Sequence, residues 1–138
     1  MAQNTSKNLR NQIIYSIYVR NYSEEGTFAA VERDLERIRD LGTDIIWLMP
    51  VHPLGVKNRK GSLGSPYAIR NYREINPEFG TLQDFRSLVD RSHERGMKCM
   101  IGVVYTPTQP HTWRDEQYTK YVYSEQVTSF MQCSTDRI

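Results

Sequence analysis

Few side chains of this sequence have the types and spacing that catalysis requires. Glu24 and Glu25 could act as paired carboxyl groups, one as an acid and the other as a base. Adjacent side chains point apart, however, and acids that precede a helix are usually solvated, so we interpret this pair as a surface feature. The three histidines, His52, His93 and His111, have no metal-ligand spacing. His52 follows an apolar run, which makes a structural loop histidine the preferred interpretation and a site histidine the alternative.

A second place to look for chemistry is the stretch MIGVVYTPTQPHT, residues 100–112. An apolar strand is expected to end here and to continue into a loop, the position at which α/β proteins carry active-site groups. The junction between strand and loop contains Gly102, Thr106 and Pro107, none of which is an acid, a base or a good metal ligand. The sequence therefore predicts no chemistry at this point.

Three apolar runs predict the strands that would position any site. Residues 13–19, 44–49 and 98–105 are rich in β-branched and aromatic side chains. Each run is almost continuously apolar, which is typical of strands buried on both faces in a parallel sheet.

Two amphipathic segments separate these strands. The first has apolar residues at helical spacing, namely Phe28, Val31, Leu35, Ile38 and Leu41. Thr27 is its predicted N-cap, and Gly42 is predicted to end it. The second begins after Thr81, carries Leu82, Phe85, Leu88 and Val89 on one face, and ends at Gly96.

The order strand, helix, strand, helix, strand predicts an α/β fold with a parallel sheet and right-handed crossovers. Residues 51–80 have no clear period and form a loop of about 30 residues, far beyond the usual ~4 to 6. Such loops are usually functional or disordered. Residues 106–138 also lack a period of 2 or 3.6, so we predict an irregular, disordered tail there.

Composition excludes several classes of partner. The chain has 18 basic and 16 acidic residues and a net charge of +2, too little to predict binding to nucleic acid or to a membrane surface. No apolar stretch approaches the ~20 residues of a membrane span, and the N-terminus lacks a secretory signal. Cys99 and Cys133 lie in different settings, as expected of free thiols in a reducing compartment. We therefore expect a cytoplasmic protein.

Specific motifs go beyond this generic architecture. Gly64-Ser65-Pro66-Tyr67, the pair Asn71-Tyr72 and the segment NPEFGT at 76–81 occur in fixed order between the second and third strands. With these motifs, residues 13–105 resemble the α-amylase family, glycoside hydrolase family 13, and most of all the start of the catalytic barrel in intracellular amylase and neopullulanase-like members. The resemblance implies an incomplete (β/α)₈ TIM barrel, comprising the first three strands and two helices. It covers about two thirds of the chain.

The resemblance implies that Tyr67 is a substrate-binding residue. It matches the family tyrosine that stacks against the sugar ring, and an aromatic face suits the apolar patch of a pyranose. The alternative is a tyrosine packed under a glycine-rich loop. Asn71 stands where the family often has Asp, which places any charge-dependent role there in doubt, and Tyr72 is interpreted as a core residue.

The resemblance also implies what this sequence lacks. After the third strand the family carries an Asp, then an Asn that often helps to hold calcium, then a sugar-contacting His. Gly102, Thr106 and Pro107 occupy these places. We therefore expect no retained calcium site at Thr106, no metal site elsewhere and no cofactor. The catalytic carboxyl groups of the family lie on later strands, so no catalytic residue is assigned.

The leading hypothesis is a fragment of an α-amylase-type glycoside hydrolase that acts on α-glucans such as maltooligosaccharides, the fragment itself being inactive. Its expected organisation is a lead-in over 1–12, a partial barrel over 13–105 and a divergent tail over 106–138. A non-enzymatic carbohydrate-binding or regulatory fragment is the alternative, and a small, complete flavodoxin-like domain is a third. Exposed sheet edges predict low stability and self-association.

Overall fold

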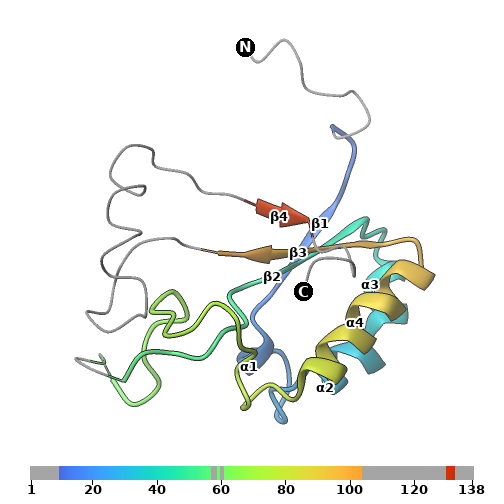
Figure 1. Cartoon of the computed structure of the whole chain (residues 1–138). Coiled ribbons are helices and arrows are strands. Elements are labelled where there is room, and N and C mark those ends of the chain that lie inside the picture. Colours follow the sequence, from blue (N-terminus) through green and yellow to red (C-terminus); the bar gives the residue numbers. More distant parts are fainter. Residues whose placement is uncertain (1–9, 57–58, 60, 104–129, 133–138) are drawn as a thin grey trace, which may run out of the picture.

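The computed structural model describes residues 10–56, 59 and 61–103, together with the backbone of 130–132. Its sheet has the order β1-β2-β3-β4 (Figure 1). Strands β1 (Ile14–Ile17), β2 (Ile45–Leu48) and β3 (Lys98–Gly102) are parallel, and Ile45 of β2 pairs with Ile14 on one side and Lys98 on the other. The predicted α/β fold with three parallel strands is confirmed.

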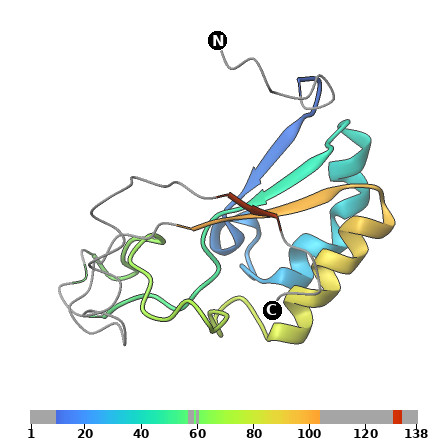
Figure 2. The same cartoon turned by 45° about the horizontal axis from the view of Figure 1, so that its top comes forward.

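In the part of the chain that the structure describes, four helices accompany the sheet: α1 (Val19–Tyr22), α2 (Phe28–Arg33), α3 (Leu35–Asp40) and α4 (Leu82–Glu94). Helices α2, α3 and α4 lie on one face of the sheet (Figure 2). The predicted caps are confirmed. Thr27 Oγ1 accepts a hydrogen bond of 3.3 Å from the Ala30 N–H, and Thr81 forms a capping box with Asp84.

The first predicted strand is shorter and more exposed than expected. It ends at Ile17, and Val19 enters a short helix in which its side chain is buried. Ile13 and Ile14 are 52% and 51% exposed, so burial on both faces is wrong for β1. The reason is that the described helices cover only one face and that β1 has a described neighbour, β2, on only one edge. Burial on both faces holds better for β2, where the successive residues Ile45 and Ile46 are both buried.

A strand within the predicted irregular tail was not anticipated. Residues Phe130–Gln132 form β4, which pairs antiparallel with β3 through Ile101 and Met131. Among the described residues, β1 and β4 are therefore the two edge strands of the sheet. The remainder of 106–138 and the end of the third predicted strand at residues 104 and 105 lie outside the described residues. Disorder in the tail and self-association stay predictions.

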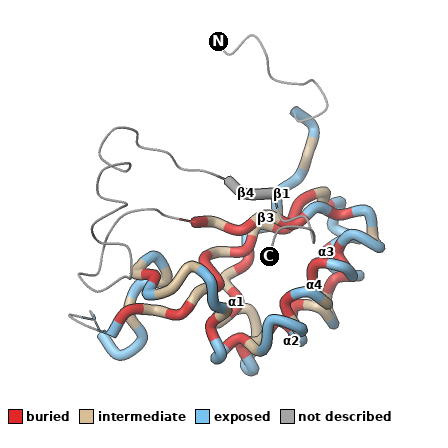
Figure 3. Tube along the Cα trace, in the orientation of Figure 1, coloured by how far each residue is buried: buried red, intermediate tan, exposed pale blue. Residues whose placement is uncertain are grey.

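The core lies between the sheet and the helices (Figure 3). Because side chains alternate along a strand, one face of each strand points to the helices and the other points away. Ile17, Ile46 and Ile101 face the helices and are buried. Trp47 and Gly102 lie on the opposite face, where both are half-buried. No helix in the described part of the chain is long and apolar enough to cross a membrane.

The first amphipathic segment is divided at Asp34, although its spacing predicts one continuous helix. Asp34 has φ −101° and ψ 3°, and its N–H bonds to the Val31 carbonyl at 3.1 Å, a tighter turn than an α-helix makes. Its carboxylate accepts hydrogen bonds from the Tyr22 hydroxyl and, at 2.9 Å, from Arg37 Nε. The Asp34 side chain at the break between α2 and α3 is therefore bonded to both Tyr22 and Arg37. The periodicity of the segment gives no sign of these contacts.

This cluster predicts an alkaline loss of stability. Burial, followed by the hydrogen bond to Asp34, raises the pKa of Tyr22 from 10.0 to about 12. The unfolded chain loses the phenolic proton near pH 10, whereas the folded chain keeps it until about pH 12. The free energy of unfolding is therefore expected to fall as the pH rises through this window. Urea unfolding of Tyr22→Phe should lack that part of the decline, and equal declines in the two proteins would contradict the assignment.

Candidate functional site

The long loop, residues 51–80, is folded back on itself at the carboxyl end of the strands (Figure 1). Its two legs form an isolated antiparallel bridge between Leu54 and Ile69. The Gly55 N–H donates to the Ala68 carbonyl at 2.7 Å, and the Arg70 N–H donates to the Pro53 carbonyl at 2.8 Å. The loop lacks a sequence period, but backbone bonds between distant residues give its described part a defined shape.

The second end of the loop is bonded to the loop's own first end and to helix α2. The Asn76 N–H donates to the Val51 carbonyl at 2.8 Å, and the Phe79 carbonyl accepts from the Phe28 N–H at 2.9 Å. Phe79 is 2% exposed and belongs to the core cluster. The end of the loop is therefore part of the folded core.

Tyr67 lies in a tight turn within the loop. The Ser65 hydroxyl accepts from the Tyr67 N–H at 3.3 Å, and the Ser65 carbonyl accepts from the Ala68 N–H at 3.1 Å. Gly64 has a positive φ of 72°, which few other residues adopt readily. The turn leaves the Tyr67 side chain 40% exposed. The stacking role and the alternative of a tyrosine packed under the loop both stay predictions.

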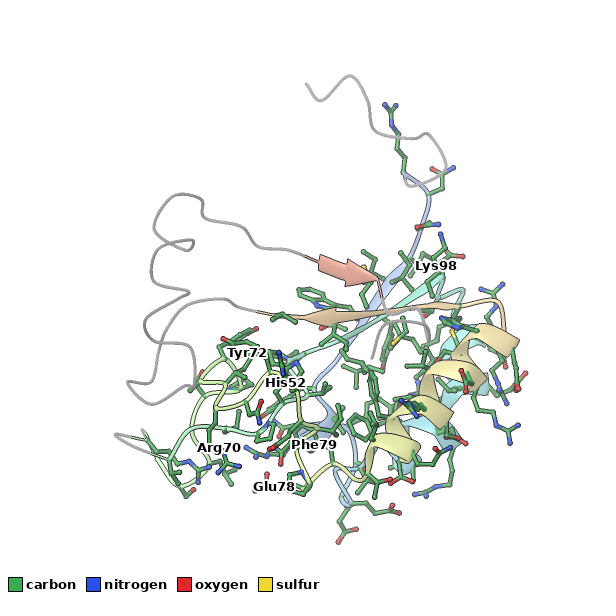
Figure 4. The ribbon with its side chains drawn as sticks, in the orientation of Figure 1. His52, Arg70, Tyr72, Glu78, Phe79 and Lys98 are labelled. Atoms are coloured by element: carbon green, nitrogen blue, oxygen red, sulfur yellow. The ribbon has the colours of Figure 1, made fainter. Side chains whose placement is uncertain are left out.

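His52 contacts Glu74 and Tyr72 within the loop (Figure 4). Its Nδ1 lies 2.9 Å from the Glu74 carbonyl oxygen, which can only accept, so Nδ1 carries the proton. Its ring lies 5.9 Å from the ring of Tyr72, which packs against the core. Burial lowers the pKa of His52, and the bond to Glu74 opposes this shift. These contacts support the interpretation of His52 as a loop histidine and of Tyr72 as a core residue.

The other candidates also have ordinary partners or lie outside the described part. Glu25 pairs with Arg33 on the surface at 2.5 Å, as expected of a solvated acid. The Asn71 side chain accepts from the Arg73 N–H at 3.0 Å and so stabilises a turn. His93 is exposed in the last turn of α4. Thr106, Pro107 and His111 lie outside the described residues.

Gly102 has a packing role that sequence reasoning missed. A Cβ atom added at Gly102 would lie 3.0 Å from Nε1 of Trp47, on the neighbouring strand β2. The glycine thus makes room for the indole on the face of the sheet that points away from the helices. In the described part of the chain, no group of three or more His, Cys, Asp or Glu side chains could hold a metal ion.

Arg20 is the second residue that sequence reasoning missed. It lies in α1, and its side chain contacts the long loop at Leu63 and Glu78. A signal was present in the sequence, because Arg20 is a charged residue directly after an almost continuous apolar run.

Parallel strands joined by helices, with a long loop after the second strand, define an α/β fold that fits the start of a (β/α)₈ barrel, with its candidate site at the carboxyl ends of the strands. The family model of the α-amylase catalytic domain matches residues 6–134. The chain therefore belongs to the α-amylase family and corresponds to the N-terminal part of its catalytic domain. The match extends further along the chain than the resemblance over 13–105.

Individual relatives agree with this assignment. An α-amylase from Lactobacillus plantarum has a solved structure that matches 94% of this chain with 49% identity and a TM-score of 0.77, and the match covers 32% of that protein. The α-1,4-glucan:maltose-1-phosphate maltosyltransferase of Arcanobacterium haemolyticum is 37% identical over 66% of this chain and 15% of its own length. The oligo-1,6-glucosidase of Parageobacillus thermoglucosidasius is 29% identical over 81% of this chain and 21% of its own length. The chain thus spans about a third or less of these relatives.

Proposed function

We propose that this chain contributes a sugar-binding loop to an enzyme that acts on α-glucans, with Tyr67 as the residue that stacks on the sugar. The observation that carries the proposal is the placement of Tyr67. Tyr67 is 40% exposed, on a loop that internal hydrogen bonds shape and that lies at the carboxyl end of the strands. Relatives named as an α-amylase and an oligo-1,6-glucosidase support an α-glucan as the ligand.

The chemistry that such an enzyme performs with retention needs two carboxyl groups about 5 Å apart, one a nucleophile and the other an acid and base. The resemblance places this pair on later strands of the barrel. We propose that the 138-residue chain by itself binds the sugar and does not cleave it. A purely binding or regulatory protein would also bind the sugar without cleaving it, and it differs from an enzyme fragment in needing no additional strands for its function.

Titration of the chain with maltoheptaose tests the role of Tyr67. Tyr67→Ala is expected to weaken binding about tenfold or more, since it removes the stacking face. Tyr67→Phe keeps the ring and should bind within about threefold of the wild type. Calorimetry or ligand-observed NMR measures the dissociation constants.

A matched control for this titration is Leu41→Ala, since Leu41 is an exposed apolar side chain, 56% exposed, outside the loop. It should leave binding unchanged. Equal affinities of the wild type and Tyr67→Ala would contradict the proposed role. In the same samples, release of reducing ends above the buffer rate would contradict the proposal that this chain does not cleave the sugar by itself.

A further inference from the structure

Arg20 occupies a largely buried position at the base of the long loop. Its side chain is 14% exposed, and the guanidinium carbon lies 5.8 Å from the ring centre of Phe79 and 6.0 Å from that of Tyr18. Such contacts between a cation and ring faces gain strength when water is excluded. A charge in this position also needs polar partners, because an unpaired buried charge is strongly unfavourable.

The polar partners of Arg20 come mainly from the loop. One guanidinium nitrogen donates to the Glu78 carboxylate near the loop's end. The other donates to the Leu63 carbonyl at 3.5 Å, a long hydrogen bond, and to the Tyr18 hydroxyl at 3.3 Å. Arg20 therefore contacts two points of the loop that lie on either side of Tyr67 in the sequence.

The backbone of Arg20 is itself closely packed. The neighbouring residue Val19 is 1% exposed within the core. After α1 the chain passes so close that a Cβ atom at Gly26, where φ is 62°, would lie 2.9 Å from the Arg20 carbonyl oxygen. The guanidinium thus extends from a fixed base, which is what a side chain needs if it is to hold a loop in place.

In the described part of the chain, the backbone hydrogen bonds of the loop do not attach its middle part to the rest of the molecule. The backbone bonds around Leu54 and Ile69 run between the two legs, so they shape the loop without attaching it to the barrel. The bond from the Phe28 N–H to the Phe79 carbonyl attaches its second end to α2, whereas the bond from Asn76 to Val51 again runs between the two legs. The Leu63 carbonyl, four residues before Tyr67, accepts a hydrogen bond from Arg20 in α1.

We propose that Arg20 is a positioning residue that holds the 61–79 part of the loop against α1 and so sets the placement of Tyr67 for sugar binding. This inference rests on the proposed function of Tyr67. Arg20 lies in the connection after β1, whereas Tyr67 lies in the loop after β2. The proposal thus gives a residue of the first connection a role in a site that the second connection carries.

Limited trypsin digestion of the full 138-residue chain tests the hold on the loop. In Arg20→Met, cleavage after Arg59, Arg70 and Arg73 is expected to accelerate about tenfold, which corresponds to the loss of a charge-assisted hydrogen bond. Cleavage after Arg86 and Arg91 in α4 should stay within about twofold, since the effect is local. Glu78→Gln should accelerate loop cleavage about threefold. Arg20→Lys should recover part of the protection, because it keeps the charge without the planar fork.

The matched control is the exposed pair of Arg33 and Glu25, with side chains 60% and 56% exposed. Arg33→Met should leave the cleavage of the loop unchanged, because exposed ion pairs contribute little. Unchanged loop cleavage in Arg20→Met and Glu78→Gln would overturn the proposal. So would equal acceleration in the loop and in α4, which indicates global unfolding.

Titration with maltoheptaose then tests whether the attachment of the loop by Arg20 affects sugar binding. Arg20→Met is expected to weaken binding about three- to tenfold while Arg33→Met binds like the wild type. Faster loop cleavage with unchanged affinity would overturn the role of Arg20 in placing Tyr67. A wild-type chain that does not bind the sugar would refute the proposed function instead, whereas the cleavage pattern would still decide whether Arg20 holds the loop.

Discussion

Phe28→Ala is expected to lower the free energy of unfolding by about 3–5 kcal/mol, the range found for buried phenylalanines. Phe28 is fully buried, and its ring meets those of Phe79 and Phe85 edge to face at 5.9 and 5.4 Å between centres. These three rings join α2, α4 and the end of the long loop. The loss is comparable with the whole stability of a small domain, so the variant should be largely unfolded in the absence of denaturant. Circular dichroism and urea titration measure it.

Leu41→Ala serves as the control for this substitution as well. Leu41 is 56% exposed, and its truncation should change the free energy of unfolding by about 0.5 kcal/mol or less. A Phe28→Ala chain as stable as Leu41→Ala would show that the three rings do not form the junction between the helices and the loop.

Gly102→Asp is expected to destabilise the chain by about 1–3 kcal/mol, the usual cost of inserting atoms into a packed region. This substitution introduces the residue that the family resemblance implies at this place. In this chain a Cβ atom there would lie 3.0 Å from Trp47 Nε1, so the indole would have to move. Lys98→Asp, on the same face of β3 but exposed, should cost less than about 1 kcal/mol.

A double-mutant cycle with Trp47→Leu isolates the contact. In the Trp47→Leu background the space above Gly102 is larger, so Gly102→Asp should cost about 1 kcal/mol less than in the wild type. The free energies come from urea unfolding of the four proteins. An equal cost in both backgrounds would mean that the glycine is needed for the backbone of β3 and not for the indole. Gly102 would then simply mark the loss of the family Asp, as the sequence alone had indicated.

The elements that sequence reasoning predicted well depend on local signals. Thr27 and Thr81 cap their helices because their hydroxyls lie within reach of N–H groups three residues ahead. Gly42 and Gly96 follow their helices with φ of 84° and 72°, a conformation that glycine adopts easily. The three parallel strands follow from apolar runs separated by helices, and the motifs around Tyr67 indicated the family.

The differences arise where a distant contact overrides a local pattern. Val19 has strand-like chemistry but is buried in a helical turn, and Asp34 divides a periodic helix while bonded to Tyr22, twelve residues earlier. The exposure of Ile14 depends on which strands and helices are present beside β1, and no property of Ile14 itself encodes this.

The sequence alone thus determined the class of fold, the order of its main elements and the family to which the chain belongs, because periodicity, caps and spaced motifs are properties of neighbouring residues. Tertiary structure alone decided that Arg20 contacts Leu63 and Glu78, 43 and 58 residues away, and that Gly102 makes room for Trp47. A charged side chain or a glycine carries little information about its partners until the chain brings them together. The placement of the loop that carries Tyr67 is decided at that level, because it depends on contacts between segments far apart in the sequence.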